Sequence, residues 1–270
     1  MIDLSLVQKN ADPTEQKLFA AVVEAGDILL KLWPGNKQNN EDLEVENKAD
    51  GSQVTKADFA SNEILLKALG ELYPEDEICS EEVGFVNDNN AERVWYVDPL
   101  DGTSNFIRGE DDFLVLLGLC KAGRPIKGIA YFPARAEFCF AASERGAYSS
   151  KTGRLSVNQQ SDLQPTKINI RGGEWGTKGY QTSYHTGAAQ YFIAKGDMQA
   201  CAYKVSDTKS PKAWDFVPFE CIINESGGRV SDEHGAEIVY AGEAFAAQYY
   251  LASNKILHDQ FLKVINAECS

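Results

Sequence analysis

The sequence predicts an α+β fold, because helical and strand patterns are separated in its first half and alternate in its second half. Two helical patterns come first, and three closely spaced strand patterns follow, which favours antiparallel pairing. Strands then alternate with helices. We therefore expect two sheets with helices, and a boundary in the polar stretch 151–164 that divides the chain into halves at 1–155 and 156–270.

The first helix is predicted to begin after Asp12, because Asp12 suits an N-cap, Pro13 suits the first helical position and Glu15 can complete a capping box. The apolar stripe of this helix consists of Leu18, Val22, Ala25, Leu29 and Leu32. A Trp-Pro-Gly sequence at 33–35 should end it. The polar residues 36–50 that follow suit a mobile flap or a plain surface loop equally well.

The second helix is predicted to start at Thr55, since Thr55 and Asp58 have the spacing of a capping box, and to run to about Leu72. Its expected core face consists of Ala60, Ile64, Ala68 and Leu72, with Leu65 and Leu69 beside them. On the residues alone, Asp58 is most simply an acid that stabilises the helix start.

The remaining elements follow from apolar patterns and turn signals. Strands are expected at 78–84, 94–97, 113–120, 126–132, 137–141, 168–171, 200–205, 228–231 and 249–252. Helices are expected near 188–194, 215–225 and 254–266. Pro218 should lie in the first turn of the second of these helices, where proline is tolerated.

The candidate metal-binding and catalytic residues gather around residue 100. A buried strand pattern at 94–97 leads into Asp98, Asp101, Gly102 and Thr103. Two acids three residues apart on a constrained turn repel each other unless cations lie between them, and hard oxygen ligands suit Mg²⁺ or Mn²⁺. Backbone N–H groups near Gly102 could bind an anion.

The string at 98–103, Asp-Pro-Leu-Asp-Gly-Thr, resembles the Asp-Pro-x-Asp-Gly-Thr signature of the inositol monophosphatase family. This family contains Mg²⁺-dependent, lithium-sensitive phosphatases, and its superfamily includes 3′-phosphoadenosine 5′-phosphate phosphatases and fructose-1,6-bisphosphatases. The motifs at 54–58, 80–82 and 214–215 match the same family in order. The resemblance covers about residues 12–266 and implies a five-layered αβαβα sandwich.

The resemblance also implies a metal site. Its ligands would be Glu82, Asp98, the carbonyl of Leu100, Asp101 and Asp215, holding two or three Mg²⁺ ions, with Mn²⁺ as an alternative. The acids at 81 and 82 are adjacent, so on an extended segment only one of them can face the metals. The family motif favours Glu82.

Asp58 and Thr103 would activate the attacking water in such an enzyme, and Glu81 would lie near that water. The expected substrate-binding residues are Gly102, Thr103, Ser104, His185 and Lys212. The resemblance therefore implies phosphomonoester hydrolysis by direct attack of water, without a covalent phosphoenzyme.

The sequence does not point to a single substrate. The sequence Ser-Asn-Phe at 104–106 resembles the inositol phosphatase branch, which favours a polyol or sugar phosphate such as inositol-1-phosphate. The stretch 184–189, however, lacks an Asp usual in that branch, so a 3′(2′),5′-bisphosphate nucleotidase is the alternative. The alternative of another class is a non-catalytic protein that binds metal and a phosphorylated metabolite, which the complete acid set argues against.

Other phosphatase chemistries fit poorly. Cys139 and Arg145 have the Cys-x5-Arg spacing of thiolate phosphatases, but Glu144 would face the phosphate and glycine is missing between them. Asp98 and Asp101 are too far apart in sequence for the Asp-x-Asp motif of aspartyl-phosphate enzymes.

Composition limits the partners and the compartment. The net charge of −14 argues against nucleic-acid polymers and anionic membranes as partners and leaves a small phosphorylated metabolite. Six cysteines without paired spacing suggest reduced thiols in a cytoplasmic protein. No apolar run has the ~18 residues of a membrane span. A homodimer is left open.

Overall fold

The computed structural model describes residues 2–36, 43–48, 53–86, 91–171, 179–181, 186–204 and 212–268. The elements of the first half are α1 (Ser5–Gln8), α2 (Pro13–Leu32), β1 (Glu46–Asn47), β2 (Gln53–Val54), α3 (Lys56–Leu72), β3 (Glu77–Ser80), β4 (Gly84–Phe85), β5 (Arg93–Asp101), α4 (Thr103–Ile107), β6 (Leu114–Lys121), β7 (Arg124–Phe132), β8 (Glu137–Ala142), β9 (Gly146–Ser149) and β10 (Gly153–Arg154). Those of the second half are β11 (Ile168–Arg171), α5 (Thr186–Lys195), β12 (Ala200–Lys204), α6 (Ala213–Glu225), β13 (Gly228–Ser231), β14 (Tyr249–Asn254) and α7 (His258–Glu268).

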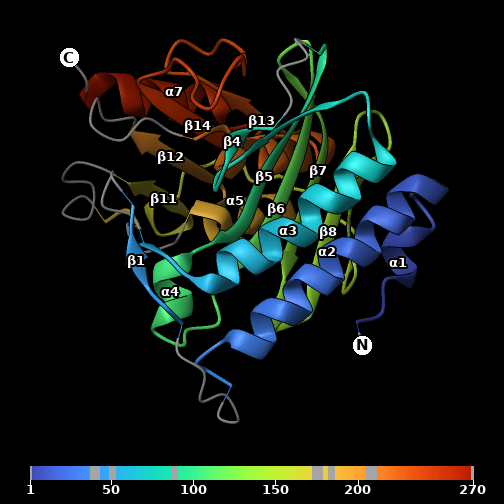
Figure 1. Cartoon of the computed structure of the whole chain (residues 1–270). Helices are drawn as coiled ribbons and strands as arrows, with labels where there is room; N and C mark the ends of the chain where they lie inside the picture. Colours follow the sequence, from blue (N-terminus) through green and yellow to red (C-terminus); the bar gives the residue numbers. More distant parts are fainter. Residues whose placement is uncertain are drawn as a thin grey trace.

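Two large sheets and three helical layers make up the fold, with a separate two-stranded antiparallel sheet of β1 and β2 (Figure 1). The larger sheet has the strand order β10-β9-β8-β7-β6-β5-β3-β4, and the smaller one β11-β12-β14-β13. Helices α2 and α3 cover one face of the larger sheet, α5 and α6 lie between the sheets, and α7 packs on the smaller sheet. The predicted five-layered αβαβα sandwich is therefore confirmed. The division into halves at 155 and 156 stays a prediction.

The predicted starts of α2 and α3 are confirmed. Asp12 caps α2 through a complete capping box with Glu15, and the predicted apolar stripe is buried. Thr55 and Asp58 form the second capping box at the start of α3. Both helices therefore begin where short-range hydrogen bonds satisfy their free N–H groups.

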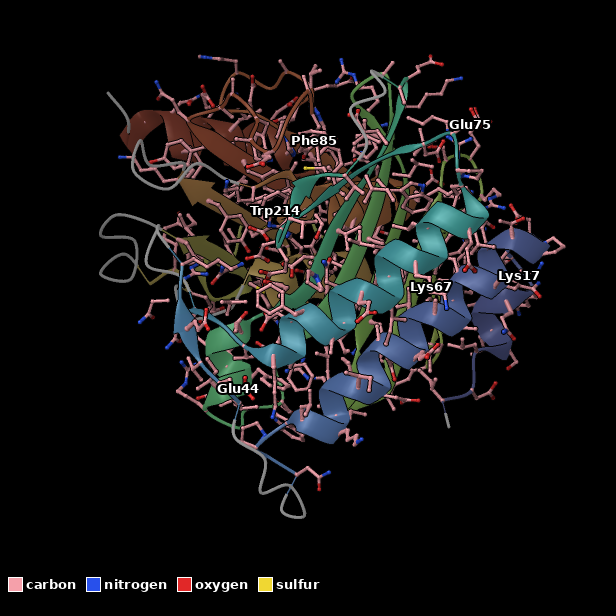
Figure 2. All side chains as sticks on the ribbon, viewed as in Figure 1. Lys17, Glu44, Lys67, Glu75, Phe85 and Trp214 are labelled. Atoms are coloured by element: carbon pink, nitrogen blue, oxygen red, sulfur yellow. The ribbon has the colours of Figure 1, made fainter. Side chains whose placement is uncertain are left out.

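The predicted core face of α3 was partly wrong. Ala60, Ile64, Ala68 and Leu72 are only half-buried, and they line a groove of about 680 Å³ between α2 and α3. Figure 2 shows Lys17 and Lys67, two further residues of this groove, on the α2 and α3 helices. The buried face of α3 carries Leu65 and Leu69, together with polar residues that contact the strands of the candidate site. Hydrophobic periodicity misses such a face because part of it is polar.

Several strand and helix bounds also differ from the expectation. β3 ends at Ser80, and the two glutamates lie in a turn rather than on an extended segment. β3 pairs in parallel with β5, so the larger sheet is mixed, whereas the three strands from β6 to β8 pair antiparallel as predicted. α7 begins at His258, four residues after the expected Asn254, because β14 continues through Asn254.

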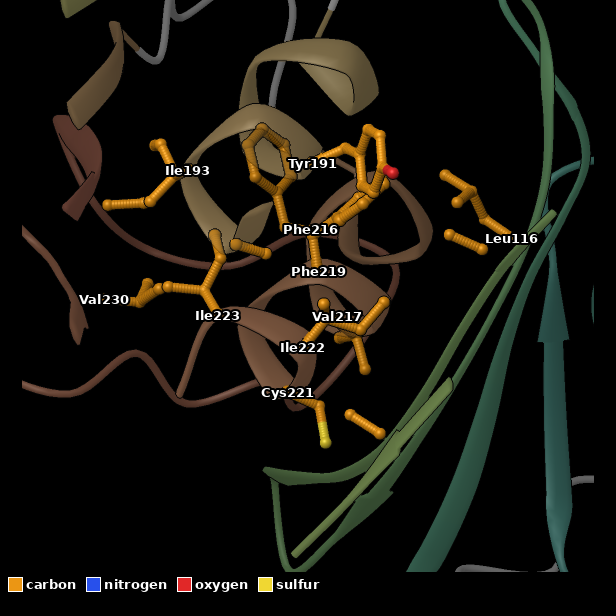
Figure 3. Packing of buried hydrophobic residues seen from close by; sticks show 14 of the residues in the cluster. Leu116, Tyr191, Ile193, Phe216, Val217, Phe219, Cys221, Ile222, Ile223 and Val230 are labelled. Carbon is orange, nitrogen blue, oxygen red and sulfur yellow. The ribbon is translucent and has the colours of Figure 1, made fainter. Parts of the chain in front are cut away.

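Helix α6 packs directly against two glycines of the larger sheet. Pro218 lies inside α6, beyond the first turn where it was predicted, and lacks an N–H that a helix interior would use. It packs against Gly118 and Gly128, which are register partners on β6 and β7. A Cβ on Gly128 would overlap the carbonyl oxygen of Pro218. Figure 3 shows the apolar residues of α6, Phe219 among them, filling the layer between the sheets. The two glycines thus allow α6 to lie close to β6 and β7.

We expect Gly128→Ala to lower the free energy of unfolding by about 1–3 kcal/mol, because the added methyl group overpacks this contact. Gly70→Ala on α3 is the matched control, since a Cβ there meets no atom within 4 Å and alanine favours helix. Urea unfolding of both variants measures the difference. An equal response of the two variants would contradict the close contact between α6 and the sheet.

Candidate active site

Asp98 and Asp101 face the same side of β5 because of a β-bulge. Asp98 pairs with Leu116 and Asp101 with Leu114, so three steps on β5 correspond to two on β6. Side chains alternate along a regular strand, and residues three apart would point to opposite faces. The extra residue restores both carboxylates to one face, where both are buried.

Asp215 comes to the same place from the other half of the chain. It lies in the first turn of α6, and one carboxylate oxygen from each of Asp98, Asp101 and Asp215 lies within 4.8 Å of the others. The carbonyl of Asp215 accepts a hydrogen bond from Gln190 Nε2 at 3.3 Å, which ties α6 to α5. The three predicted aspartates thus form one cluster, called the acid cluster below.

The acid cluster suits a divalent cation. Burial raises the pKa of Asp98 well above its usual value, and the charges of Glu81, Asp101 and Asp215 raise it further. Burial and the charge of Glu81 likewise raise the pKa of Asp101. Ionised carboxylates this close together are unfavourable without a cation, and oxygen ligands are those that Mg²⁺ prefers. The donor set therefore fits the metal that the family resemblance implies.

Asp58 and Thr103 lie in contact, as the sequence predicted. The Thr103 hydroxyl is 3.2 Å from Asp58 Oδ1 and 3.0 Å from the carbonyl oxygen of Leu100. The other carboxylate oxygen of Asp58 accepts from the N–H and the hydroxyl of Thr55, each at 2.7 Å. Burial raises the pKa of Asp58 to about 6, although the Thr55 hydrogen bonds oppose this shift. One carboxylate thus caps α3 and faces Thr103.

The two adjacent glutamates have different surroundings. The charge of Glu81 acts on both Asp98 and Asp101, which places its carboxylate beside the acid cluster. The side chain of Glu82 is only 2% exposed, and burial raises its pKa to about 7. Lys48 binds both, with its Nζ atom 2.9 Å from Glu81 Oε1 and 2.9 Å from Glu82 Oε1.

Gly102 forms the turn that follows the acid cluster. Its φ of 89° lies in the left-handed region, and a Cβ would meet the carbonyl oxygen of Asp112 at 2.8 Å. Gly102 thereby starts the short helix α4, which carries Thr103 and Ser104. The Ser104 hydroxyl is 3.4 Å from Gln53 Oε1 on β2.

The second half supplies the opposite wall. A Cβ on Gly187, near the start of α5, would lie 2.8 Å from Asp101 Oδ2, so a larger residue here would displace the Asp101 carboxylate. Arg171 ends β11, and its positive charge acts on Asp101. Lys212 is 3.3 Å from Glu243 and lies over the ring of Trp214. His185 lies outside the described residues.

Sequence reasoning missed residues that hold the site in place. Ser61 donates to the carbonyl of Pro99 at 2.8 Å, and Asn62 accepts from Ser80 at 2.7 Å. Residues 58, 61 and 62 share one helical face, so this spacing of polar residues beside Asp58 was a usable signal. Lys48 had no such signal, because it lies in a polar segment without a motif.

Buried clustered carboxylates beside a threonine on an αβαβα fold define a candidate metal-dependent phosphatase. A family model described as "Inositol monophosphatase family" matches residues 10–269, so the chain belongs to that family. It is accordingly a phosphoric monoester hydrolase of a family whose phosphatases are generally Mg²⁺-dependent, and the non-catalytic alternative is not supported.

The names of the similar proteins point to different phosphorylated substrates. A histidinol-phosphatase of Mycobacterium tuberculosis is 29% identical over 93% of this chain and 97% of its own. The 3′(2′),5′-bisphosphate nucleotidase CysQ of Escherichia coli K12 is 28% identical over 80% and 89%. The crystal structure of the extragenic suppressor protein suhB from Bartonella henselae has a TM-score of 0.78 at 22% identity, covering 93% of this chain and 98% of its own. At that identity, the structural likeness concerns the fold. Among the described residues, no helix is long and apolar enough to cross a membrane.

Metal removal should abolish activity, because the acid cluster is unfavourable without a cation. We expect EDTA to stop phosphate release and excess Mg²⁺ to restore it. Asp101→Asn should weaken Mg²⁺ binding by more than about tenfold, measured by calorimetry. Asp259→Asn, at an 82% exposed side chain on α7, is the matched control and should bind Mg²⁺ normally. Full phosphate release in chelator would refute the metal requirement.

Proposed function

We propose that the chain hydrolyses the phosphomonoester of a small polyol or sugar, similar to inositol-1-phosphate, by direct attack of water. The observation that carries this proposal is the acid cluster next to the Asp58 and Thr103 pair. The cluster can hold cations and the pair can hold a water molecule, and both lie at the end of β5. No residue in this arrangement needs to take up the phosphoryl group.

Two or three Mg²⁺ ions, or Mn²⁺ in their place, would be held by Asp98, Asp101, Asp215 and the carbonyl of Leu100. The sequence favoured Glu82 as a further ligand and Glu81 near the water. The electrostatics favour the reverse, because the charge of Glu81 raises the pKa of Asp98 in the acid cluster, although Lys48 contacts both glutamates equally. When bound, such ions supply charge stabilisation of the phosphoryl oxygens and lower the pKa of water.

Asp58 and Thr103 would orient the water. The Thr103 hydroxyl can donate to Asp58 or to the Leu100 carbonyl, so its oxygen is free to accept a hydrogen bond from water. A carboxylate with a pKa of about 6 is suited to take up a proton near neutral pH. We infer that the proton of the attacking water passes through Thr103 to Asp58.

The phosphate would lie between two backbone segments. Gly102, Thr103 and Ser104 at the start of α4 can donate hydrogen bonds to its oxygens. The start of α5 at Gly187 approaches Asp101 from the other side, and helix N-termini favour anions. The roles of Ser104 and His185 in substrate binding stay predictions. Lys212 is less well suited, because it pairs with Glu243 and Trp214.

A specific observation favours a second candidate function, the hydrolysis of a 3′(2′),5′-bisphosphate nucleotide. Arg171 places a guanidinium group close enough to act on Asp101, at the edge of the smaller sheet. A cation there suits a substrate with a second anionic group, since Arg binds phosphate in a two-pronged manner. A 28% identical nucleotidase is among the similar proteins.

Three further properties belong to the proposal. Lithium inhibition follows from the family resemblance. A cytoplasmic location agrees with five buried cysteines that form no disulfide among the described residues. The homodimer stays a prediction.

Asp58→Asn tests the proton path. Asn still accepts the N-terminal hydrogen bonds of α3 but cannot take up a proton. We expect turnover to fall by ~10²-fold or more, with little change in stability or Mg²⁺ affinity. Asp101→Asn should instead lose Mg²⁺ affinity as well as turnover. Near-normal turnover of folded Asp58→Asn at saturating Mg²⁺ would limit Asp58 to capping α3.

A substrate panel combined with Arg171→Gln separates the two candidate functions. The panel consists of inositol-1-phosphate, 3′-phosphoadenosine 5′-phosphate, fructose-1,6-bisphosphate and histidinol phosphate. If Arg171 binds a second phosphate, Arg171→Gln should lower kcat/KM about tenfold for the bisphosphates and leave inositol-1-phosphate unchanged. Arg229→Gln, on β13 and paired with Asp259, is the matched control. A highest kcat/KM for inositol-1-phosphate, unaffected by Arg171→Gln, would favour the polyol phosphatase.

A further inference from the structure

Lys48 joins a segment remote in sequence to the paired glutamates. It follows β1 directly, and its ammonium group makes 2.9 Å hydrogen bonds to one carboxylate oxygen of Glu81 and one of Glu82. The partners are 33 and 34 residues away in the chain, so the tertiary fold makes this contact. The Lys48 side chain is 23% exposed, and that of Glu82 is almost fully buried.

Lys48 is a cation at neutral pH, as an ordinary lysine is. Two carboxylates lie 2.9 Å from its Nζ atom and pair with this charge. Its neighbour Glu81 also acts electrostatically on Asp98 and Asp101, so the ammonium lies at the border of the acid cluster.

The same carboxylates would serve two cations that repel each other, the Lys48 ammonium and a metal ion. A Mg²⁺ ion prefers oxygen ligands, and a carboxylate ligand stabilises it through its negative charge. In the structure, one oxygen of each glutamate accepts from Lys48, so the ammonium already neutralises part of that charge. Lysine is a point charge on a flexible stem, so its ammonium can withdraw without moving the backbone of the acids.

We propose that Lys48 is an internal counter-ion of the metal site, whose ammonium competes with a divalent cation for the carboxylates of Glu81 and Glu82. This inference rests on the proposed metal site, but it holds whichever glutamate is the ligand. Lys48 acts through the two acids and is therefore a positioning residue. The ammonium neutralises the acids while no ion is bound, and its displacement weakens the apparent metal affinity.

Metal binding measures this competition without any substrate. Isothermal titration of the metal-free full chain with Mn²⁺ and with Mg²⁺ should show about tenfold tighter binding in Lys48→Gln, because the competing cation is gone. Lys56→Gln is the control for loss of one positive charge, since Lys56 pairs with Glu44 at 3.8 Å on the surface. It should change the affinity by less than about twofold. Unchanged or weaker binding in Lys48→Gln would overturn the proposal.

Thermal unfolding supplies a second readout that a purely structural ion pair would not produce. In EDTA, Lys48→Gln should have a lower Tm than wild type, because its glutamates lose their counter-ion. At saturating Mg²⁺ this difference should disappear, since the ion replaces the ammonium and stabilises the folded state by mass action. An equal loss of Tm with and without Mg²⁺ would show a structural tether and refute competition.

These measurements separate this proposal from the proposed function. Absence of Mn²⁺ and Mg²⁺ binding in wild type and Lys48→Gln alike would refute the metal site and the competition together. Tighter binding in Lys48→Gln would support the competition even if none of the tested phosphates were hydrolysed.

Discussion

Repulsion between buried carboxylates at the end of β5 is the constraint on which the rest of the site depends. Three aspartates offer oxygen atoms within 4.8 Å of one another, and two of them are buried. Such an arrangement is unfavourable unless the surrounding structure holds it and a cation neutralises it. The bulge in β5, the close packing of α6 and the polar face of α3 can each be understood as part of this support.

The helices that hold the acid cluster in place, α6 and α3, also pack in the core of the protein. Gly118 and Gly128 leave room for Pro218, so that α6 can lie close enough to the larger sheet to bring Asp215 into the acid cluster. α3 contributes polar side chains to the carbonyl of Pro99, between Asp98 and Asp101, and to the Ser80 hydroxyl just before the two glutamates. The apolar packing of these helices thus supplies the rigidity that a preorganised site needs.

Much of the fold could be predicted from the sequence because its signals are local. The capping boxes at Asp12 and Thr55 and the alternating strands from β6 to β8 depend on neighbouring residues only. The acid cluster was predicted through motifs. The contacts of Lys48 were not, because they join residues distant in sequence and follow no periodic pattern. The bulge in β5 was missed since register depends on the partner strand.

The proposed catalytic residues and the proposed site for a second phosphate belong to different sheets of this molecule. Asp98 and Asp101 belong to β5 of the larger sheet, and Thr103 to the short helix α4 that follows it. Arg171 ends a strand of the smaller sheet. α5 and α6 connect the two, through Gly187 at Asp101 and through Gln190 at Asp215. If Arg171 binds a second phosphate as proposed, a change on the smaller sheet would alter which alcohol is bound without moving the carboxylates. Such a separation would give a physical reason why one scaffold can serve polyol, histidinol and nucleotide phosphates, since fold alone does not specify the substrate.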